Sequence, residues 1–247
     1  MPGIPSTETL FRVADLTKRY GRVTALSDVS FSVRRGEVLG LIGPNGSGKT
    51  TLFECLGGVL PIDAGVVCSQ EGRPLERREL TSLLFYLPDA VAPWPAQSVR
   101  WALDFTIGFF GGAPARRDEV IERLDLAPLL GSLIGSLSKG QRKRALLGIG
   151  LLTPHPVLLA DEPFEGLDLR QARDVAGTLQ SAADAGRTLF LSIHQIGDAG
   201  RVCDRFVLLS SGRVCGEGTL DELSDLAAAN HPALVGRDLE EVFLALT

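Results

Sequence analysis

The sequence predicts a three-layer α/β domain with an N-terminal antiparallel β subdomain and an inserted helical subdomain. Three observations lead to this fold class. Short β-rich runs broken by turns fill the N-terminal part, and short apolar runs later alternate with helical patterns. A long stretch of helical patterns then separates two of the apolar runs. Apolar runs that alternate with helices are typical of buried parallel strands.

The strands and helices follow in order. From residue 11 to 38, β-rich runs are broken at Gly21 and at Arg35-Gly36, which predicts antiparallel strands joined by turns. An apolar run at 38–43, a glycine-rich loop and a helical pattern at 50–60 predict strand, loop and helix. Further strands are expected as follows: buried parallel strands at 157–161 and 187–193, and a hairpin at 205–218 that turns at Ser211-Gly212.

Longer helical patterns fill the stretch between Pro88 and Leu152, including residues 98–110 and 116–130. No strand is expected there, so this stretch is interpreted as a helical insertion in one domain. The predicted division is an α/β core of residues 1–88 and 153–220, a helical subdomain of residues 89–152, and a C-terminal helical tail of residues 221–247.

Length and composition exclude several classes of protein. The chain has 247 residues and a net charge of −5, which suits one globular domain and disfavours a nucleic-acid partner. The longest stretch without a charged residue, 145–160, carries two prolines, so no membrane span is expected. The N-terminus has no secretory pattern, and the four cysteines lack the spacing of a disulfide scaffold or zinc site. We therefore expect a cytoplasmic protein with reduced cysteines.

Residues 43–50 fit the pattern G-x-x-x-x-G-K-[ST] between an apolar run and a helical pattern. Glycines let backbone N–H groups face phosphate oxygens, and the positive end of the following helix attracts the same anion. Lys49 is placed to reach the β- and γ-phosphates, and Thr50 to ligate Mg²⁺. The alternative is a turn that only joins strand to helix. The predicted nucleotide-binding residues of this segment are Gly43, Pro44, Asn45, Gly46, Ser47, Gly48, Lys49, Thr50 and Thr51.

Two acidic residues end the apolar run at 157–161. Asp161 is predicted to hold Mg²⁺ beside the phosphate loop. Glu162 is adjacent and could orient or deprotonate the attacking water, which makes it the expected general base. The alternative is an acidic pair that caps the next helix, and Pro163 also suits that role. His194 follows another apolar run, at the edge where open α/β sheets bind ligands, although a lone histidine is equally often structural.

Several motifs in this order resemble those of the nucleotide-binding subunits of ATP-binding cassette (ABC) transporters, over almost the whole chain. Residues 43–50 resemble the Walker A loop, and residues 157–162 resemble the Walker B stretch. Residues 137–141, Leu-Ser-Lys-Gly-Gln, resemble the signature LSGGQ. On its own, the signature segment would instead suit the start of a cationic surface helix. The ordered spacing favours the signature.

The resemblance implies roles for further residues. Asp168 corresponds to the D-loop, His194 to the switch histidine, and Tyr20 to the aromatic residue that stacks on adenine. It also implies that two subunits sandwich two ATP molecules, with Mg²⁺ as cofactor. Signature residues of one subunit would then contact the γ-phosphate bound by the other. These residues are Ser138, Lys139, Gly140 and Gln141.

The partners implied are a second cassette, expected to be an identical chain, and a separate transmembrane permease subunit. The chain would then be peripheral at the inner face of the cell membrane. The C-terminal residues 239–247 resemble the ending of exporter-type subunits of the ABC-2 group. Aromatic residues that follow Asp89 could contact the permease: Trp94, Trp101, Phe105, Phe109 and Phe110. For the last three of these, an ordinary helical core is an equally good interpretation.

Two positions depart from the family pattern. Lys139 replaces the second-position glycine of the signature, which should leave the contacts of Ser138 and Gly140 intact. Asp89 stands where the family has the Q-loop glutamine. A carboxylate there can reach Mg²⁺ or its water but cannot donate as an amide does, so coupling to the permease should be tuned differently. The alternative is a turn residue after Pro88.

The predicted function is ATP hydrolysis to ADP and phosphate, coupled to transport and most consistent with export. Glu162 activates water, and His194 holds Glu162 and the γ-phosphate in register. Two alternatives stay open. One is a cassette ATPase acting on ribosomes or DNA, which the single cassette and the acidic balance disfavour. The other is a regulatory ATP-binding module with weak hydrolysis, which Asp89 leaves possible.

Overall fold

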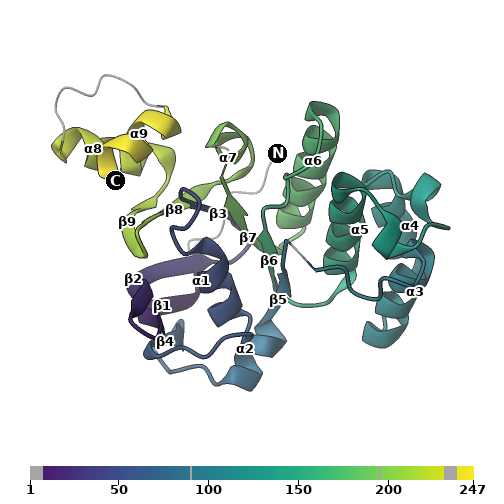
Figure 1. Ribbon diagram of the computed structural model, residues 1–247, viewed down its shortest axis with the longest axis horizontal. Helices are drawn as coiled ribbons and strands as arrows, with labels where there is room; N and C mark the ends of the chain where they lie inside the picture. The colour runs from purple at the N-terminus through teal and green to yellow at the C-terminus, as the bar shows by residue number, and fades with distance from the viewer. Residues whose placement is uncertain (1–7, 90, 195, 231–237) are drawn as a thin grey trace.

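The computed structural model describes residues 8–89, 91–194, 196–230 and 238–247, whose strands form two sheets (Figure 1). The predicted fold class is confirmed, because a parallel-rich sheet, an antiparallel sheet and an inserted group of helices are all present. The strands are β1 (Thr9–Tyr20), β2 (Val23–Arg34), β3 (Val38–Ile42), β4 (Ala64–Ser69), β5 (Leu84–Leu87), β6 (Val157–Asp161), β7 (Thr188–Ile193), β8 (Arg205–Ser210) and β9 (Arg213–Gly218).

The larger sheet has the strand order β5-β6-β7-β3-β8-β9, in which only β9 runs antiparallel to its neighbour. Every residue of β3, β6 and β7 is buried, as their apolar runs predict. In the parallel registers Ile42 pairs with Ile193, and Asp161 pairs with Ser192. The carboxyl ends of three central strands therefore meet at one edge of the sheet.

The smaller sheet has the order β2-β1-β4, with β1 antiparallel to both neighbours. Its first hairpin turns at Gly21, which has a φ of 60° and so occupies the left-handed region that favours glycine. The two sheets share an aromatic core. The ring centre of Phe190 on β7 lies 5.4 Å from the ring centre of Phe31 on β2 and 4.9 Å from that of Phe53 on the first helix.

The helices gather in two groups besides those that flank the larger sheet. Figure 1 shows α3, α4 and α5 together at one end of the molecule, and α8 and α9 at the other. The helices are α1 (Lys49–Leu56), α2 (Arg77–Leu83), α3 (Val99–Phe110), α4 (Pro114–Arg123), α5 (Lys139–Leu152), α6 (Leu169–Asp184), α7 (Ile196–Val202), α8 (Leu220–Asn230) and α9 (Leu239–Leu246), with 3₁₀ turns at Ala127–Leu129 and Ile134–Ser136.

The helix expected over residues 116–130 ends earlier than predicted, at Arg123. Asp125 has a φ of 47°, a conformation that does not continue a helix. The Arg144 guanidinium donates to the main-chain oxygens of Leu124 and Asp125, at 3.0 and 3.1 Å, and so stabilises this ending. The helix expected over 50–60 likewise ends at Leu56, before two glycines.

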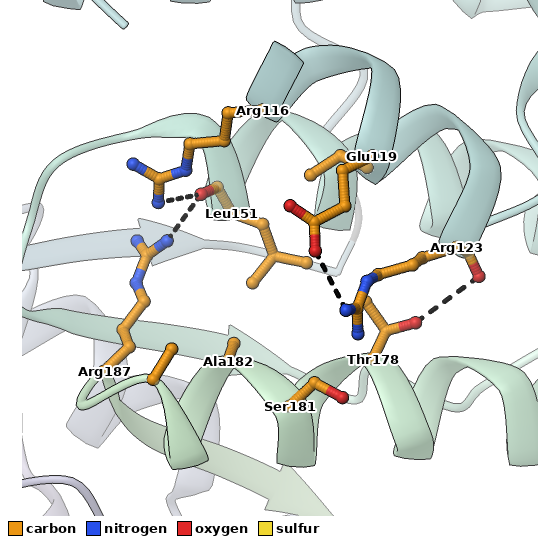
Figure 2. A pocket seen from close by; sticks show the side chains of 10 residues that line it. Arg116, Glu119, Arg123, Leu151, Thr178, Ser181, Ala182 and Arg187 are labelled. Carbon is orange, nitrogen blue, oxygen red and sulfur yellow. Dashed lines mark hydrogen bonds and ion pairs between the residues drawn. The ribbon is translucent and has the colours of Figure 1, made fainter. Parts of the chain in front are cut away.

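Two arginines hold the C-terminal end of α5. Figure 2 shows the side chains of Arg116 on α4 and Arg187 before β7 pointing from opposite sides to the main-chain oxygen of Leu151. The donor–acceptor distances are 2.8 and 2.9 Å, and Arg187 also donates to the oxygen of Gly150 at 2.8 Å. The last carbonyl groups of a helix have no partner within it, so these bonds satisfy them. Burial and the neighbouring Arg116 charge lower the pKa of Arg187 to about 10.

The ends of the chain are described only in part. The predicted C-terminal tail contains α8 and α9, while residues 231–237 lie outside the described residues. Residues 1–7, at the N-terminus where no secretory pattern is expected, also lie outside them. The division at residues 88, 152 and 220 stays a proposal.

Candidate functional site

The glycine-rich loop joins β3 to α1 at the edge where the central strands end. Gly46 and Gly48 have φ values of 81° and 107°, which side-chain-bearing residues rarely adopt. Gly43 also requires a glycine, because a Cβ there would lie 2.3 Å from the main-chain oxygen of Leu209. These glycines let the loop curl tightly ahead of α1. Ser47 Oγ is buried in this loop and has no hydrogen-bond partner among the described residues.

An open pocket of about 390 Å³ lies over this loop. It brings the loop together with the ends of β6 and β7 and with Asp89. The lining residues are Ala25, Asn45, Gly46, Gly48, Lys49, Thr50, Thr51, Asp89, Asp161, Glu162, Glu165 and His194. Backbone N–H groups at a helix N-terminus and a lysine on one side, with carboxylates opposite, suit a polyphosphate and its metal ion.

Lys49 is the first residue of α1, and 6% of its surface is exposed. Its Nζ donates to the main-chain oxygens of Gly43 and Pro44, at 2.7 and 3.3 Å. The same Nζ lies 3.7 Å from Glu162 Oε1 across the pocket. The ammonium group therefore stands at the mouth of the loop with a carboxylate facing it. A phosphate group in the pocket would offer it a stronger, charged partner.

Thr50 and Asp161 meet as the sequence predicts. Thr50 Oγ1 donates to Asp161 Oδ2 at 2.9 Å, and the Ser192 hydroxyl donates to Asp161 Oδ1. Asp161 is 3% exposed and lies at the end of β6. These two hydroxyls hold its carboxylate in place. A hydroxyl and a carboxylate at this distance are a suitable oxygen donor set for Mg²⁺. The residues present therefore fit the metal ion that the sequence implies.

Glu162 adopts a rare backbone conformation, with a φ of 49°. Its N–H donates to the main-chain oxygen of Ser192 at 3.2 Å and to Ser192 Oγ at 3.0 Å. The side chain turns into the pocket, where Glu162 Oε2 lies 2.6 Å from His194 Nδ1. A non-glycine residue in this region costs about 1–3 kcal/mol and persists only where its surroundings hold it. The paired carboxylate and imidazole form an acid–base pair over the phosphate loop.

Asp89 does not stand free in the pocket. Asp89 Oδ1 lies 2.5 Å from the Nζ of Lys143 on α5, and Asp89 Oδ2 lies 3.9 Å from the Nζ of Lys139. Lys139 also pairs with Glu165 at 2.5 Å, a hydrogen bond that raises the pKa of this lysine. Two cations and two carboxylates thus form one network. The predicted contact of Asp89 with Mg²⁺ would compete with Lys143 and stays a prediction.

The signature-like residues begin α5 and do not line the pocket. Ser138 Oγ accepts a hydrogen bond from the Gln141 N–H at 3.3 Å, while Gln141 Oε1 accepts one from the Ser138 N–H at 3.0 Å. This reciprocal capping box makes the segment a true helix N-terminus. Gly140 packs so closely that a Cβ there would lie 2.5 Å from the main-chain oxygen of Gly166.

Asp168 and Tyr20 also lie outside the pocket. Asp168 caps α6, because its Oδ1 accepts hydrogen bonds from the N–H groups of Arg170 and Gln171, both at 2.9 Å. Tyr20 ends β1 with 47% of its surface exposed, and Lys18 Nζ lies 5.7 Å from its ring centre. The adenine contact of Tyr20 stays a prediction.

Sequence reasoning missed three contributors to this site: Ser192, Lys143 and Glu165. Ser192 had a signal, because it interrupts the otherwise apolar run of β7, and a fully buried hydroxyl needs a partner. The only signal for Lys143 in the sequence is its position on an apolar helix.

Tyr86 also lies near this site. Burial, followed by the negative charge of Asp161, raises the pKa of its phenol. That hydroxyl therefore stays neutral.

The chain is similar to known proteins in sequence and in fold. Residues 26–165 match the family model described as ABC transporter. A daunorubicin resistance ATP-binding protein of Streptomyces coeruleorubidus is 34% identical over 230 residues, which cover 87% of this chain and 70% of the relative. The Nod factor export ATP-binding protein I of Ralstonia nicotianae is 34% identical over 229 residues, covering 90% and 70%.

A solved structure of an ATP binding subunit of an ABC transporter superposes with a TM-score of 0.83 at 28% identity. The match covers 96% of this chain and 99% of the other. Within the described parts of this chain, no helix combines the length and the apolar character needed to cross a membrane.

Proposed function

We propose that this chain, which belongs to the ABC transporter family, binds ATP and hydrolyses it to ADP and phosphate. This reaction would power export through a separate transmembrane permease subunit. The observation that supports hydrolysis is the arrangement of Lys49, Glu162 and His194. Glu162 lies 3.7 Å from the Lys49 ammonium and 2.6 Å from the imidazole, inside the pocket over the phosphate loop.

The proposed mechanism assigns each group one task. Backbone N–H groups of the loop and Lys49 bind the β- and γ-phosphates. The N–H dipoles and the positive charge of Lys49 stabilise the negative charge that develops as the γ-phosphoryl group leaves ADP. Glu162 orients the attacking water and accepts its proton. His194 holds the Glu162 carboxylate through the 2.6 Å contact. The water oxygen bonds to the γ-phosphorus while the bond from that phosphorus to the bridging oxygen of ADP breaks, which yields ADP and inorganic phosphate.

Mg²⁺ is the proposed metal cofactor. Thr50 Oγ1 and Asp161 Oδ2, 2.9 Å apart, would hold the ion or its bound water. When bound, the ion would neutralise phosphate charge. Ser192 donates a hydrogen bond to Asp161 Oδ1 and so fixes this oxygen. Asp161 Oδ2 therefore stays directed at Thr50.

Export is the proposed direction of transport, because the relatives named above are a drug resistance protein and a Nod factor export protein. The chain would then lie at the inner face of the cell membrane, in contact with its permease. An exposed row of stacked rings supports a protein contact there. Ring centres of Trp101 and Phe105 lie 5.0 Å apart, and those of Phe105 and Phe109 lie 5.9 Å apart, with Phe109 71% exposed.

Substitution of Glu162 by glutamine tests the proposed reaction. Glu162→Gln keeps the shape of the side chain but removes the base, so ATP turnover should fall by about a hundredfold to ten-thousandfold. Affinity for a fluorescent ATP analogue should stay within about threefold, because Lys49 and the loop are untouched. Phosphate release and equilibrium binding measure the two quantities. Near-normal turnover in the variant would remove Glu162 from the mechanism.

A further inference from the structure

Lys143 is a buried cation whose position connects three parts of the site. It lies on α5, and 5% of its surface is exposed. Its Nζ donates to Asp89 Oδ1 at 2.5 Å and to the main-chain oxygen of Asp161 at 3.0 Å. A buried ammonium group is expensive unless it is paired, and Asp89 supplies the opposite charge. The second bond goes to a neutral carbonyl group, so pairing of charge does not account for it.

That carbonyl group belongs to the peptide unit between Asp161 and Glu162. The N–H of the same unit donates to the main-chain oxygen of Ser192 at 3.2 Å and to Ser192 Oγ at 3.0 Å. Lys143 and Ser192 therefore hold the two opposite edges of one peptide plane. The next residue is Glu162, whose φ of 49° is unfavourable for a glutamate. The direction of its carboxylate depends on this plane staying fixed.

We propose that Lys143 is a positioning residue for hydrolysis, which fixes the peptide plane of Asp161 and Glu162 so that the Glu162 carboxylate stays aimed into the pocket. Asp89 acts through Lys143, because its carboxylate holds the ammonium group against that plane. This inference rests on the proposed role of Glu162 in the reaction. It gives Asp89 a purpose that does not require contact with the metal ion.

Lys143→Met tests the proposal, since methionine fills a similar volume but cannot donate to the Asp161 oxygen. A loosened plane misplaces Glu162 without disturbing Lys49 or the loop, so kcat should fall at least about tenfold. The dissociation constant for Mg-ATP should change by less than about threefold. Lys143→Arg, which retains a charged donor, should recover part of the lost kcat. An unchanged kcat in Lys143→Met would overturn the proposal.

Arg144→Met is the matched control for general loss of stability. Arg144 is the next residue on α5, is 7% exposed, and also donates to two main-chain oxygens, but those belong to Leu124 and Asp125 outside the pocket. Its removal should lower the thermal midpoint and leave kcat unchanged below that midpoint. The proposal is wrong if Arg144→Met lowers kcat as much as Lys143→Met does.

A double substitution shows whether Lys143 acts through Glu162. In the Glu162→Gln background the base is already absent, so adding Lys143→Met should reduce the residual rate by less than about twofold. A further tenfold reduction would mean that Lys143 serves another step, against the proposal. Asp89→Asn combined with Lys143→Met should likewise lose no more kcat than Lys143→Met alone.

We call the hold of Lys143 on the peptide plane of Asp161 and Glu162 the clamp. Hydrogen exchange of the Glu162 backbone amide tests this clamp without nucleotide turnover. Lys143→Met should increase the exchange rate of this amide at least about threefold, whereas Arg144→Met should not. Unchanged exchange would reject the clamp. If the unmodified chain failed to hydrolyse ATP while Lys143→Met still accelerated this exchange, the proposed function would be wrong and the clamp itself would stand.

Discussion

Lys49 illustrates how one side chain is prepared for a charged ligand. The residue is 6% exposed, and its ammonium group is held by two main-chain oxygens of the loop and faced by Glu162 at 3.7 Å. Neutral carbonyl groups satisfy the hydrogen bonds of a cation without neutralising its charge. The site therefore keeps a positive charge at the place where the loop N–H groups also point.

Removal of this charge should cost nucleotide affinity. Lys49→Ala deletes charge-assisted hydrogen bonds of about 1.5–3 kcal/mol each, so affinity for ATP should fall by about tenfold to a hundredfold or more. Titration calorimetry with Mg-ATP measures the change. Arg123→Ala is the control, since it removes an exposed cation that pairs with Glu119 on α4, and should bind ATP normally. Intact binding in Lys49→Ala would contradict the assignment of the phosphate loop.

At the residue scale, motifs predict groups that contact the ligand better than groups that support them. Asp161 and Glu162 follow an apolar run and His194 follows another, so their meeting at one sheet edge could be predicted from the sequence. Ser192 and Lys143 could not be assigned, because their roles depend on register and on the packing of α5 against β6. Asp168 shows the converse, since its structural role as a helix cap was not predicted.

Between elements, a buried ion network joins the two sheets. Arg205 on β8 pairs with Glu37 Oε2 at 3.0 Å and with Glu217 Oε1 on β9 at 2.6 Å. Glu217 Oε1 also accepts hydrogen bonds from the N–H and the hydroxyl of Ser32 on β2. Glu37 is fully buried, and burial raises its pKa although Arg205 opposes the shift. The network fixes the antiparallel sheet beside the strand that leads to the phosphate loop.

Arg205→Met should destabilise the fold by about 3–5 kcal/mol, because it leaves a buried carboxylate without its cation. Chemical denaturation measures the free energy of unfolding. Arg213→Met, which breaks an exposed 3.7 Å pair with Asp28, should change that free energy by less than about 0.5 kcal/mol. Because the folded pKa of Glu37 lies above its unfolded value, the contribution of Glu37 to stability falls as pH rises above 4.5. Arg205 opposes this rise in pKa, so removing Arg205 raises the pKa of Glu37 further. The Arg205→Met deficit should therefore be larger at pH 7 than at pH 5.

Elements with a strong apolar pattern were predicted well, and short or half-exposed ones were not. The strands β3, β6, β7 and β8 have apolar runs, and the structure confirms them together with β9, which pairs with β8 in the predicted hairpin. The edge strand β4 and the helix α2 were not identified. Only one residue of β4 and one of α2 are buried, so their sequences carry little periodic signal.

Over the whole molecule, the predicted site is divided between two places. The phosphate loop, Asp161, Glu162 and His194 share one pocket, whereas Ser138 caps α5 outside it. A helix N-terminus with exposed N–H groups is suited to bind an anion. Its position outside the pocket of its own subunit is explained if the γ-phosphate that it contacts is bound by a second copy. The arrangement therefore supports the proposed sandwich of two chains and two ATP molecules.

The proposed sandwich predicts that the oligomeric state depends on ATP. Glu162→Gln should retain ATP at the interface, so light scattering on a size-exclusion column should show the mass of the 26.4 kDa chain about doubling when Mg-ATP is added. Adding Lys49→Ala to this variant should keep it monomeric, because nucleotide no longer joins the two surfaces. A Glu162→Gln protein that binds ATP and stays monomeric would contradict a homodimer. The signature residues would then have to meet a different cassette, held in place by the permease.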